Sequence, residues 1–204
     1  MLSRAPLHLD FNRTCLAIGT ALWLAAVTWG LTIVWAYENR PGIAADAPVR
    51  WPAASALTAA SDGPTLVVLA HPQCTCTRAS IEELAQVIAR APRPPTTYVL
   101  FLKPAGLEAG WEQTDLWRQA GALPHVPVHR DDGSVEARRF GVATSGQTLL
   151  YDRGGRLVYS GGITGSRGHA GNNAGEAALI DLLTRGAADR SGANVFGCPL
   201  FARG

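Results

Sequence analysis

Residues 65–78 read Thr-Leu-Val-Val-Leu-Ala-His-Pro-Gln-Cys-Thr-Cys-Thr-Arg, and they decide the fold. The first six form a β-branched and aliphatic run without polar alternation, which predicts a strand buried on both faces. Between residues 81 and 88 apolar side chains recur at helical spacing, and Pro92 ends that pattern. The stretch therefore predicts a strand followed directly by a helix, with two cysteines at the junction.

The residues that follow continue the alternation of strands and helices. Two apolar runs around Arg153-Gly154-Gly155 predict a β-hairpin, and Gly186 is a plausible stop for a last helix. The predicted elements after the first helix are strands at 96–102, 126–129, 148–152 and 156–160, and helices at 111–120 and 173–184. This order predicts an α/β fold in which a central mixed sheet is flanked by helices.

An uncharged apolar stretch of 23 residues, 15–37, precedes this domain. About 20 helical residues cross a bilayer core, and Trp35 and Tyr37 supply an aromatic anchor at one end. We therefore expect one N-terminal transmembrane helix. A cleaved signal peptide, cut at 45–47, is the alternative, but the apolar region of a signal peptide spans only about 7 to 15 residues.

The flanks of the span suggest how the chain is organised. Residues 1–14 form a short tail, which we expect to stay in the cytoplasm while the long domain is exported. Residues 38–62 are rich in proline and alanine and lack apolar periodicity, which predicts a spacer. The folded domain is then expected over residues 63–204, enough for a single core.

Composition and charge exclude several functions. The chain has 18 basic and 16 acidic residues and a net charge of +2, and the bases are scattered, so no nucleic-acid partner is expected. The single lysine, Lys103, does not follow a glycine-rich turn, which excludes a phosphate loop. Four cysteines, at positions 15, 74, 76 and 198, are too few for a disulfide scaffold.

Cys74 and Cys76 carry the chemistry most visible in the sequence. A cysteine at a helix N-terminus faces unpaired backbone N–H groups and the positive end of the helix dipole, and both favour the thiolate. Two cysteines separated by one residue can also pair, but the small ring strains the disulfide and makes it easier to reduce. The alternative is that both are ordinary small apolar residues of the first turn.

Several motifs resemble known redox proteins. The strand, the cysteine turn, the helix and the hairpin resemble the thioredoxin superfamily, in particular membrane-anchored periplasmic thiol:disulfide proteins. Five segments are similar to the RedB redox protein family over about residues 64–200, namely 71–80, 114–118, 139–141, 144–146 and 160–169. The resemblance implies a thioredoxin-like fold, a redox role, a protein thiol or disulfide partner, and a single-pass location in the bacterial inner membrane with the domain facing the periplasm.

The resemblance also implies roles for residues near the cysteines. If Cys74 is the attacking thiol, Thr77 stands where thioredoxins have their second cysteine, and Cys76 becomes a resolver one residue short of that place. Placing Cys76 second and Gln73 first is the other frame. His71 adjoins the turn and is expected to influence the thiolate. No cofactor is needed for such a thiol-disulfide oxidoreductase.

The loop that carries a cis-proline in thioredoxins has none in this chain. The supporting residues Ser145, Gly146 and Gln147 lead into the next strand without proline. A cis bond before any other residue costs several kcal/mol, so a trans bond is expected there.

Cys198 and His169 leave two further hypotheses open. One hypothesis is that in an oxidising compartment the tail folds back, so that Cys198 resolves or covers the other two cysteines; the alternative is a free thiol in an apolar patch. Because Cu(I) favours thiolates, Cys74, Cys76 and His169 form an alternative copper site. A thioredoxin scaffold that binds partners without catalysis is the third possibility.

Overall fold

The computed structural model describes residues 7–201, and the chain divides into two compact units, Met1–Asn39 and Arg40–Gly204. In the described part of the first unit, residues 7–38 form one helix, α1 (Leu7–Glu38). Its part from Phe11 to Glu38 is long and apolar enough to cross a membrane, and none of that stretch is buried. The predicted span lies within this helix, and residues 7–14 of the expected tail continue it; residues 1–6 lie outside the described part.

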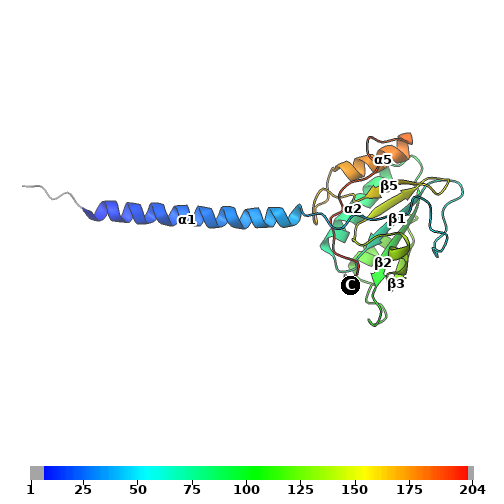
Figure 1. Ribbon diagram of the computed structural model, residues 1–204, viewed down its shortest axis with the longest axis horizontal. Coiled ribbons are helices and arrows are strands. Elements are labelled where there is room, and N and C mark those ends of the chain that lie inside the picture. Colours follow the sequence, from blue (N-terminus) through cyan, green and yellow to red (C-terminus); the bar gives the residue numbers. More distant parts are fainter. Residues whose placement is uncertain (1–6, 202–204) are drawn as a thin grey trace, which may run out of the picture. The chain divides into compact units, whose positions relative to one another are not determined.

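The second unit is built on a five-stranded mixed sheet in the order β3-β2-β1-β4-β5 (Figure 1). The three strands β1, β2 and β3 run parallel, whereas β4 is antiparallel to both β1 and β5. The strands span Thr65–Ala70 (β1), Thr96–Lys103 (β2), Val128–Asp132 (β3), Thr148–Tyr151 (β4) and Leu157–Gly161 (β5). Each predicted strand is present, with its ends shifted by at most three residues.

Helices pack around this sheet. They are α2 (Thr75–Arg90), α3 (Asp115–Gly121), α4 (Val135–Arg139) and α5 (Ala174–Arg185). The order β1-α2-β2 followed by β4-β5-α5, with β4 antiparallel and next to β1, is the thioredoxin-like arrangement, and β3 extends the sheet beyond β2. The predicted fold class is confirmed.

The two faces of the sheet are covered in different ways. Successive side chains of a strand point to opposite faces, so Leu66 and Val68 meet one layer and Val67 and Leu69 the other. The first layer comes from apolar stripes of α2, α3 and α5, which include Leu84 and other buried residues. The apolar side chains of these helices recur at helical spacing, so the sequence predicted this layer of the core.

The second face depends on a segment that was expected to be a spacer. Residues 40–57, which we call the N-terminal cover, pack onto the sheet instead of linking two units. The Trp51 ring lies 5.2 Å from the ring of Phe140 and 5.2 Å from that of Tyr151, edge to face. The spacer prediction fails for a physical reason: β1 is apolar on both faces, and α4, only five residues long, leaves most of the second face to be covered.

Helix α4 was not predicted, and α3 begins four residues later than predicted. The short α4 is held by a carboxylate from the preceding strand. Asp131 accepts hydrogen bonds from the backbone N–H of Glu136 at 2.8 Å and of Ala137 at 2.9 Å. These contacts satisfy donors at the helix N-terminus that have no partner within the helix.

Candidate functional site

The two close cysteines lie where β1 ends and α2 begins. Cys74 is the N-cap residue of α2, and Cys76 lies in its first turn; both are buried, at 1% and 4% exposed. Cys74 lies in a tight turn, in which the Cys74 N–H donates to the His71 carbonyl at 3.2 Å. The Cys74 carbonyl in turn accepts from the Thr77 N–H at 3.0 Å. The expected position of the pair at a helix N-terminus is confirmed.

The loop before β4 is fastened to this turn by hydroxyl groups. Ser145 Oγ accepts from the His71 N–H at 2.8 Å and lies 2.9 Å from Thr77 Oγ1. Thr77 Oγ1 donates to the His71 carbonyl at 2.9 Å, so the Ser145 hydroxyl is the donor to Thr77. Thr77 therefore has a structural role in the cysteine turn, and Ser145 joins the loop to that turn.

The other two supporting residues shape the same loop. Gly146 has φ +84° and donates its N–H to the Leu69 carbonyl at 2.7 Å. Gln147 is buried, and its side-chain amide donates to Ser160 Oγ at 3.1 Å, so it braces the loop against β5. Throughout residues 7–201 the backbone has no cis peptide bond, as expected for a loop without the proline.

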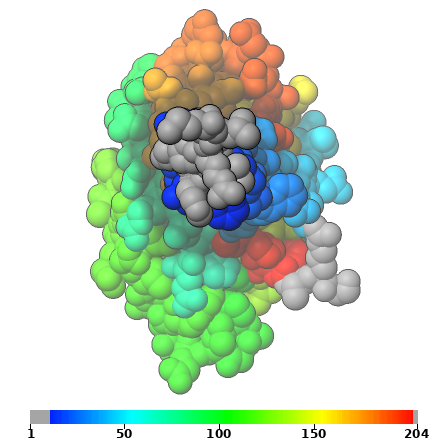
Figure 2. Space-filling view, turned by 90° about the vertical axis from the view of Figure 1, so that its left-hand side faces the viewer, coloured from blue at the N-terminus to red at the C-terminus, as the bar shows by residue number. Residues whose placement is uncertain are grey.

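The C-terminal tail, residues 190–201, reaches the cysteines from the far end of the chain. The Cys198 carbonyl accepts from the Ser145 N–H at 2.9 Å, and the Leu200 N–H donates to the Ala143 carbonyl at 2.9 Å. Together with the antiparallel bridge between Thr144 and Pro199, these bonds pair the tail with the loop as a short strand. In Figure 2 the end of this tail, in red, reaches the molecular surface.

Three sulfurs meet at this point. The thiols of Cys76 and Cys198 both form side-chain hydrogen bonds with Cys74. All the cysteines of the described chain are free, and the fourth, Cys15, lies in α1. The structure thus brings together the two predicted site cysteines and the tail cysteine, as the fold-back hypothesis requires; which of them reacts with which is a separate question.

The electrostatics separate the three cysteines into one thiolate and two thiols. The hydrogen bond from Cys76 lowers the pKa of Cys74 to about 4; burial opposes this, and Cys198 and the Thr77 N–H add to it. The same hydrogen bond, together with burial, raises the pKa of Cys76 far above its usual range. Burial, followed by the Cys74 contact, raises the pKa of Cys198 to about 11. Cys74 is therefore ionised at neutral pH, and its two neighbours are protonated donors.

His71 affects the cysteine turn through its contacts and not through a positive charge. Burial lowers its pKa, although the nearby Cys74 charge acts in the opposite direction. Nδ1 accepts from the Gln73 N–H at 3.1 Å, and the ring packs edge to face on Trp111 at 5.7 Å. A neutral imidazole with an unprotonated Nδ1 does not stabilise a thiolate as a cation would, so the expected influence of His71 acts through the turn that it holds.

The donor set of the copper alternative is not assembled in this arrangement. His169 is exposed, and its Nδ1 lies 2.8 Å from the Arg167 carbonyl. Its neighbour Gly168 forms a backbone hydrogen bond with Cys76. Across residues 7–201, no three His, Cys, Asp or Glu side chains are grouped so that they could hold a metal ion. The residues present therefore do not fit this metal site.

Two residues that the sequence did not single out for the site hold the tail in place. Arg167 Nη1 donates to the Gly197 carbonyl at 2.9 Å, and Arg167 Nε donates to the Arg40 carbonyl at 3.2 Å. A Cβ atom on Gly197 would lie 1.9 Å from the Ser145 carbonyl oxygen, so only glycine permits this approach. In the sequence, the glycine next to Cys198 is a signal of this close approach. It can be interpreted only when the opposing segment, residues 143–145, is known.

Fold and site together define a thioredoxin-like domain that presents a buried thiolate at the start of its first sheet-packed helix. No protein-family model matches the chain, and no curated protein matches it. Among solved structures, an uncharacterised conserved protein of Geobacillus kaustophilus superposes with a TM-score of 0.61 at 16% identity, over 81% of this chain and 98% of its own.

Two further solved structures are similar. A hypothetical protein of Sinorhizobium meliloti superposes with a TM-score of 0.55 at 22% identity, over 79% of this chain and 93% of its own. The pneumococcal exposed lipoprotein thioredoxin of Streptococcus pneumoniae has a TM-score of 0.43 at 16% identity, over 59% of this chain and 82% of its own. At these identities the likeness concerns the fold.

Proposed function

We propose that this protein is a membrane-anchored thiol-disulfide oxidoreductase in which Cys74 is the nucleophile. The observation that carries the proposal is one ionised sulfur at the N-terminus of α2 with two protonated thiols hydrogen-bonded to it. A thiolate is the reactive species in disulfide exchange, and a low thiol pKa at a helix start is typical of redox cysteines. The sequence resemblance to the RedB family supports the same role.

The chemistry is two successive exchanges. The Cys74 thiolate attacks one sulfur of a partner disulfide, which forms a mixed disulfide and releases the second partner sulfur as a thiolate that takes up a proton. A second thiol of this chain then loses its proton and attacks Cys74 Sγ, which forms an internal disulfide and releases the partner's first sulfur. One partner disulfide is reduced and one internal disulfide is formed. Each exchange is reversible, so an oxidised site can act on a partner dithiol.

Both neighbouring cysteines are placed to resolve the mixed disulfide. Their pKa values are raised in part by the charge on Cys74, which disappears when Cys74 enters the mixed disulfide, so both thiols then ionise more easily. A bond between Cys74 and Cys76 closes a small ring with unfavourable geometry, whereas Cys198 approaches from a separate strand without that restraint. We propose Cys76 and Cys198 as alternative resolvers.

The proposed location is supported by α1 and by the resemblance. A helix of 28 apolar-rich residues is long enough to span a bilayer, and a transmembrane role for it places the thioredoxin-like domain next to a membrane surface. Cysteine pairs that cycle between thiol and disulfide suit an oxidising compartment. We propose a single pass of the bacterial inner membrane, with the domain in the periplasm and protein thiols or disulfides as partners.

The test follows single-turnover release of 5-thio-2-nitrobenzoate from its symmetrical disulfide by full-length protein in detergent. A Cys15→Ser background removes the fourth thiol. The parent should release two equivalents rapidly at neutral pH, one on attack and one on resolution. Cys74→Ser should lose this fast phase, while Cys198→Ser should keep its first equivalent. A fast phase that is unchanged in Cys74→Ser overturns the proposal and favours a non-catalytic scaffold.

A further inference from the structure

The tail makes main-chain contacts at the place where a redox partner has to arrive. Its carbonyl at Cys198 and its N–H at Leu200 are bonded to Ser145 and Ala143, and the Cys198 thiol is hydrogen-bonded to Cys74. A partner sulfur that reacts with Cys74 must reach the same atom. Since β-strand addition uses main-chain groups that every polypeptide carries, a partner segment can make the same bonds.

We propose, on the basis of the function proposed above, that the tail residues 195–200, Val-Phe-Gly-Cys-Pro-Leu, are a tethered competitor of the redox partner. They occupy the edge formed by residues 143–145, so an extended cysteine-bearing segment of the partner has to displace them before its sulfur reaches Cys74. The partner segment enters as an added strand, and its cysteine takes the position of Cys198.

The contacts of the tail define the segment that fits. The residue before the cysteine must be glycine, because a Cβ at Gly197 would lie 1.9 Å from the Ser145 carbonyl oxygen. The second residue after the cysteine should be apolar, because Leu200 is 3% exposed and packs into the core of the second sheet face. The substrate class is therefore an extended peptide of the pattern glycine, cysteine, any residue, apolar residue.

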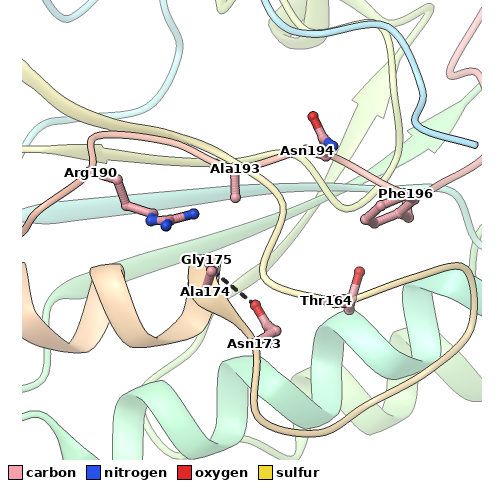
Figure 3. A pocket seen from close by; sticks show the side chains of 9 residues that line it. Thr164, Asn173, Ala174, Gly175, Arg190, Ala193, Asn194 and Phe196 are labelled. Carbon is pink, nitrogen blue, oxygen red and sulfur yellow. Dashed lines mark hydrogen bonds between the residues drawn. The ribbon is translucent and has the colours of Figure 1, made fainter. Parts of the chain in front are cut away.

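Two hollows border the tail. One, of about 400 Å³, is lined by tail residues Ala193, Asn194 and Phe196 together with Thr164 and the start of α5 (Figure 3). Another, of about 430 Å³, lies beside the last described residues of the tail and is lined by His71, Leu102, Pro104, Arg138, Pro199 and Phe201. The tail itself is buried at Val195, Phe196 and Leu200, so a partner segment has to supply apolar side chains of its own when it replaces the tail.

Return of the tail would couple resolution with release. When Cys198 comes back to Cys74, its thiol loses a proton and its sulfur bonds to Cys74 Sγ, and the partner sulfur leaves as a thiolate that takes up a proton. The same movement returns the Cys198 carbonyl and the Leu200 N–H to the loop, so the partner strand loses its main-chain bonds. Cys76 resolves the mixed disulfide only while the tail is still displaced.

The test compares two probes with the same leaving group on full-length protein in the Cys15→Ser background. One is the peptide Val-Phe-Gly-Cys-Pro-Leu with 5-thio-2-nitrobenzoate on its cysteine, and the other is the symmetrical disulfide of that reagent. The ratio of the two rate constants cancels changes in Cys74 nucleophilicity. Gly197→Ala pushes the tail off the edge and should raise the ratio about tenfold, as expected for the loss of one or two net hydrogen bonds.

A matched control separates displacement of the tail from the added methyl group. Gly63→Ala adds the same methyl group where nothing lies within 4 Å, so it should leave the ratio unchanged. A peptide with valine before its cysteine should react more slowly in every variant. An unchanged ratio in Gly197→Ala overturns the competition by the tail, whereas loss of reaction with both probes in the parent contradicts the proposed function itself.

A second measurement tests displacement of the tail without a destabilising variant. In Cys198→Ser the peptide probe stays bonded to Cys74 for long enough to follow amide hydrogen exchange, provided that Cys76 is also changed to serine. The Leu200 amide should lose its protection when the peptide is attached, and the Ser145 amide should keep it, because the peptide replaces the tail as acceptor. Protection that persists at Leu200 shows that the tail was not displaced and overturns the proposal.

Discussion

Two irregular segments complete this domain, the N-terminal cover (residues 40–57) and the C-terminal tail (residues 190–201), and they lie against different parts of it. Main-chain hydrogen bonds hold both segments: the Trp51 N–H donates to the Gly155 carbonyl, and the Ser145 N–H donates to the Cys198 carbonyl. Both segments also contribute apolar side chains to the core. The cover packs the Trp51 ring on two aromatic rings of the second sheet face, whereas the tail brings a thiol to Cys74.

The difference teaches which segment can control the reactive sulfur. The cover stabilises a sheet face through a large ring, and packing of this kind is specific to the residues that make it. The tail lies along the edge next to Cys74, where the main-chain groups of another strand can form the same hydrogen bonds. We therefore expect changes in the cover to alter stability, and changes in the tail to alter the reactivity of Cys74.

The largest effect is expected for Trp51→Ala. Removing a large ring from between Phe140 and Tyr151 should lower the free energy of unfolding by about 3 kcal/mol. Urea unfolding followed by circular dichroism measures this. Val49→Ala, which truncates an exposed side chain of the same segment, is the control and should have little effect. Equal stability of the Trp51 variant and the parent would show that the cover is not fixed by side chains.

The next effect concerns pH and the thiolate. Cys76→Ala removes the largest cause that lowers the pKa of Cys74, so this pKa should rise. In the parent the rate of Cys74 alkylation should stay level from neutral pH down towards pH 4, because the thiolate persists; in the variant it should fall at a higher pH. Cys198→Ala removes a smaller cause and should shift the profile less. The reverse order of the two variants would contradict the assigned hydrogen bonds.

A smaller effect is expected where the loop meets the cysteine turn. Ser145→Ala leaves the His71 N–H without its acceptor and removes the hydrogen bond to Thr77, and it should cost roughly 1 to 3 kcal/mol of stability. The comparison is Ser61→Ala, an exposed serine. If the two variants unfold at the same urea concentration, the hydroxyl contacts do not fasten the loop.

The smallest effect tests the residue that contacts both segments. Arg167→Met removes donors to the Gly197 and Arg40 carbonyls, which should loosen the tail and raise the peptide-to-reagent rate ratio about twofold. Loss of the Arg167 charge should also raise the pKa of Cys198 further. Arg93→Met, at an exposed arginine before β2, is the control. A ratio that falls in the Arg167 variant would mean that Arg167 does not hold the tail.

How much of the structure could be predicted from the sequence depends on whether the contacts are local. Helical spacing on α2 and the apolar run of β1 are local patterns, so the fold and the position of Cys74 at a helix start were predictable. The cover was mistaken for a spacer because proline and alanine show no periodicity, even where they pack on a sheet. The pairing of Cys198 with Ser145 joins residues more than fifty positions apart, and no local pattern encodes it; only the hypothesis that the tail folds back anticipated the contact.

A strand that belongs to the same chain as its docking edge competes at a fixed local concentration. For a short flexible tether this concentration is on the order of millimolar, whatever the amount of protein in the compartment. A partner that docks weakly or lacks a matching strand therefore gains little access to Cys74, even when it is abundant. If the tail, residues 190–201, is the competitor that we propose, it sets an affinity threshold that a partner disulfide has to exceed before it reaches Cys74.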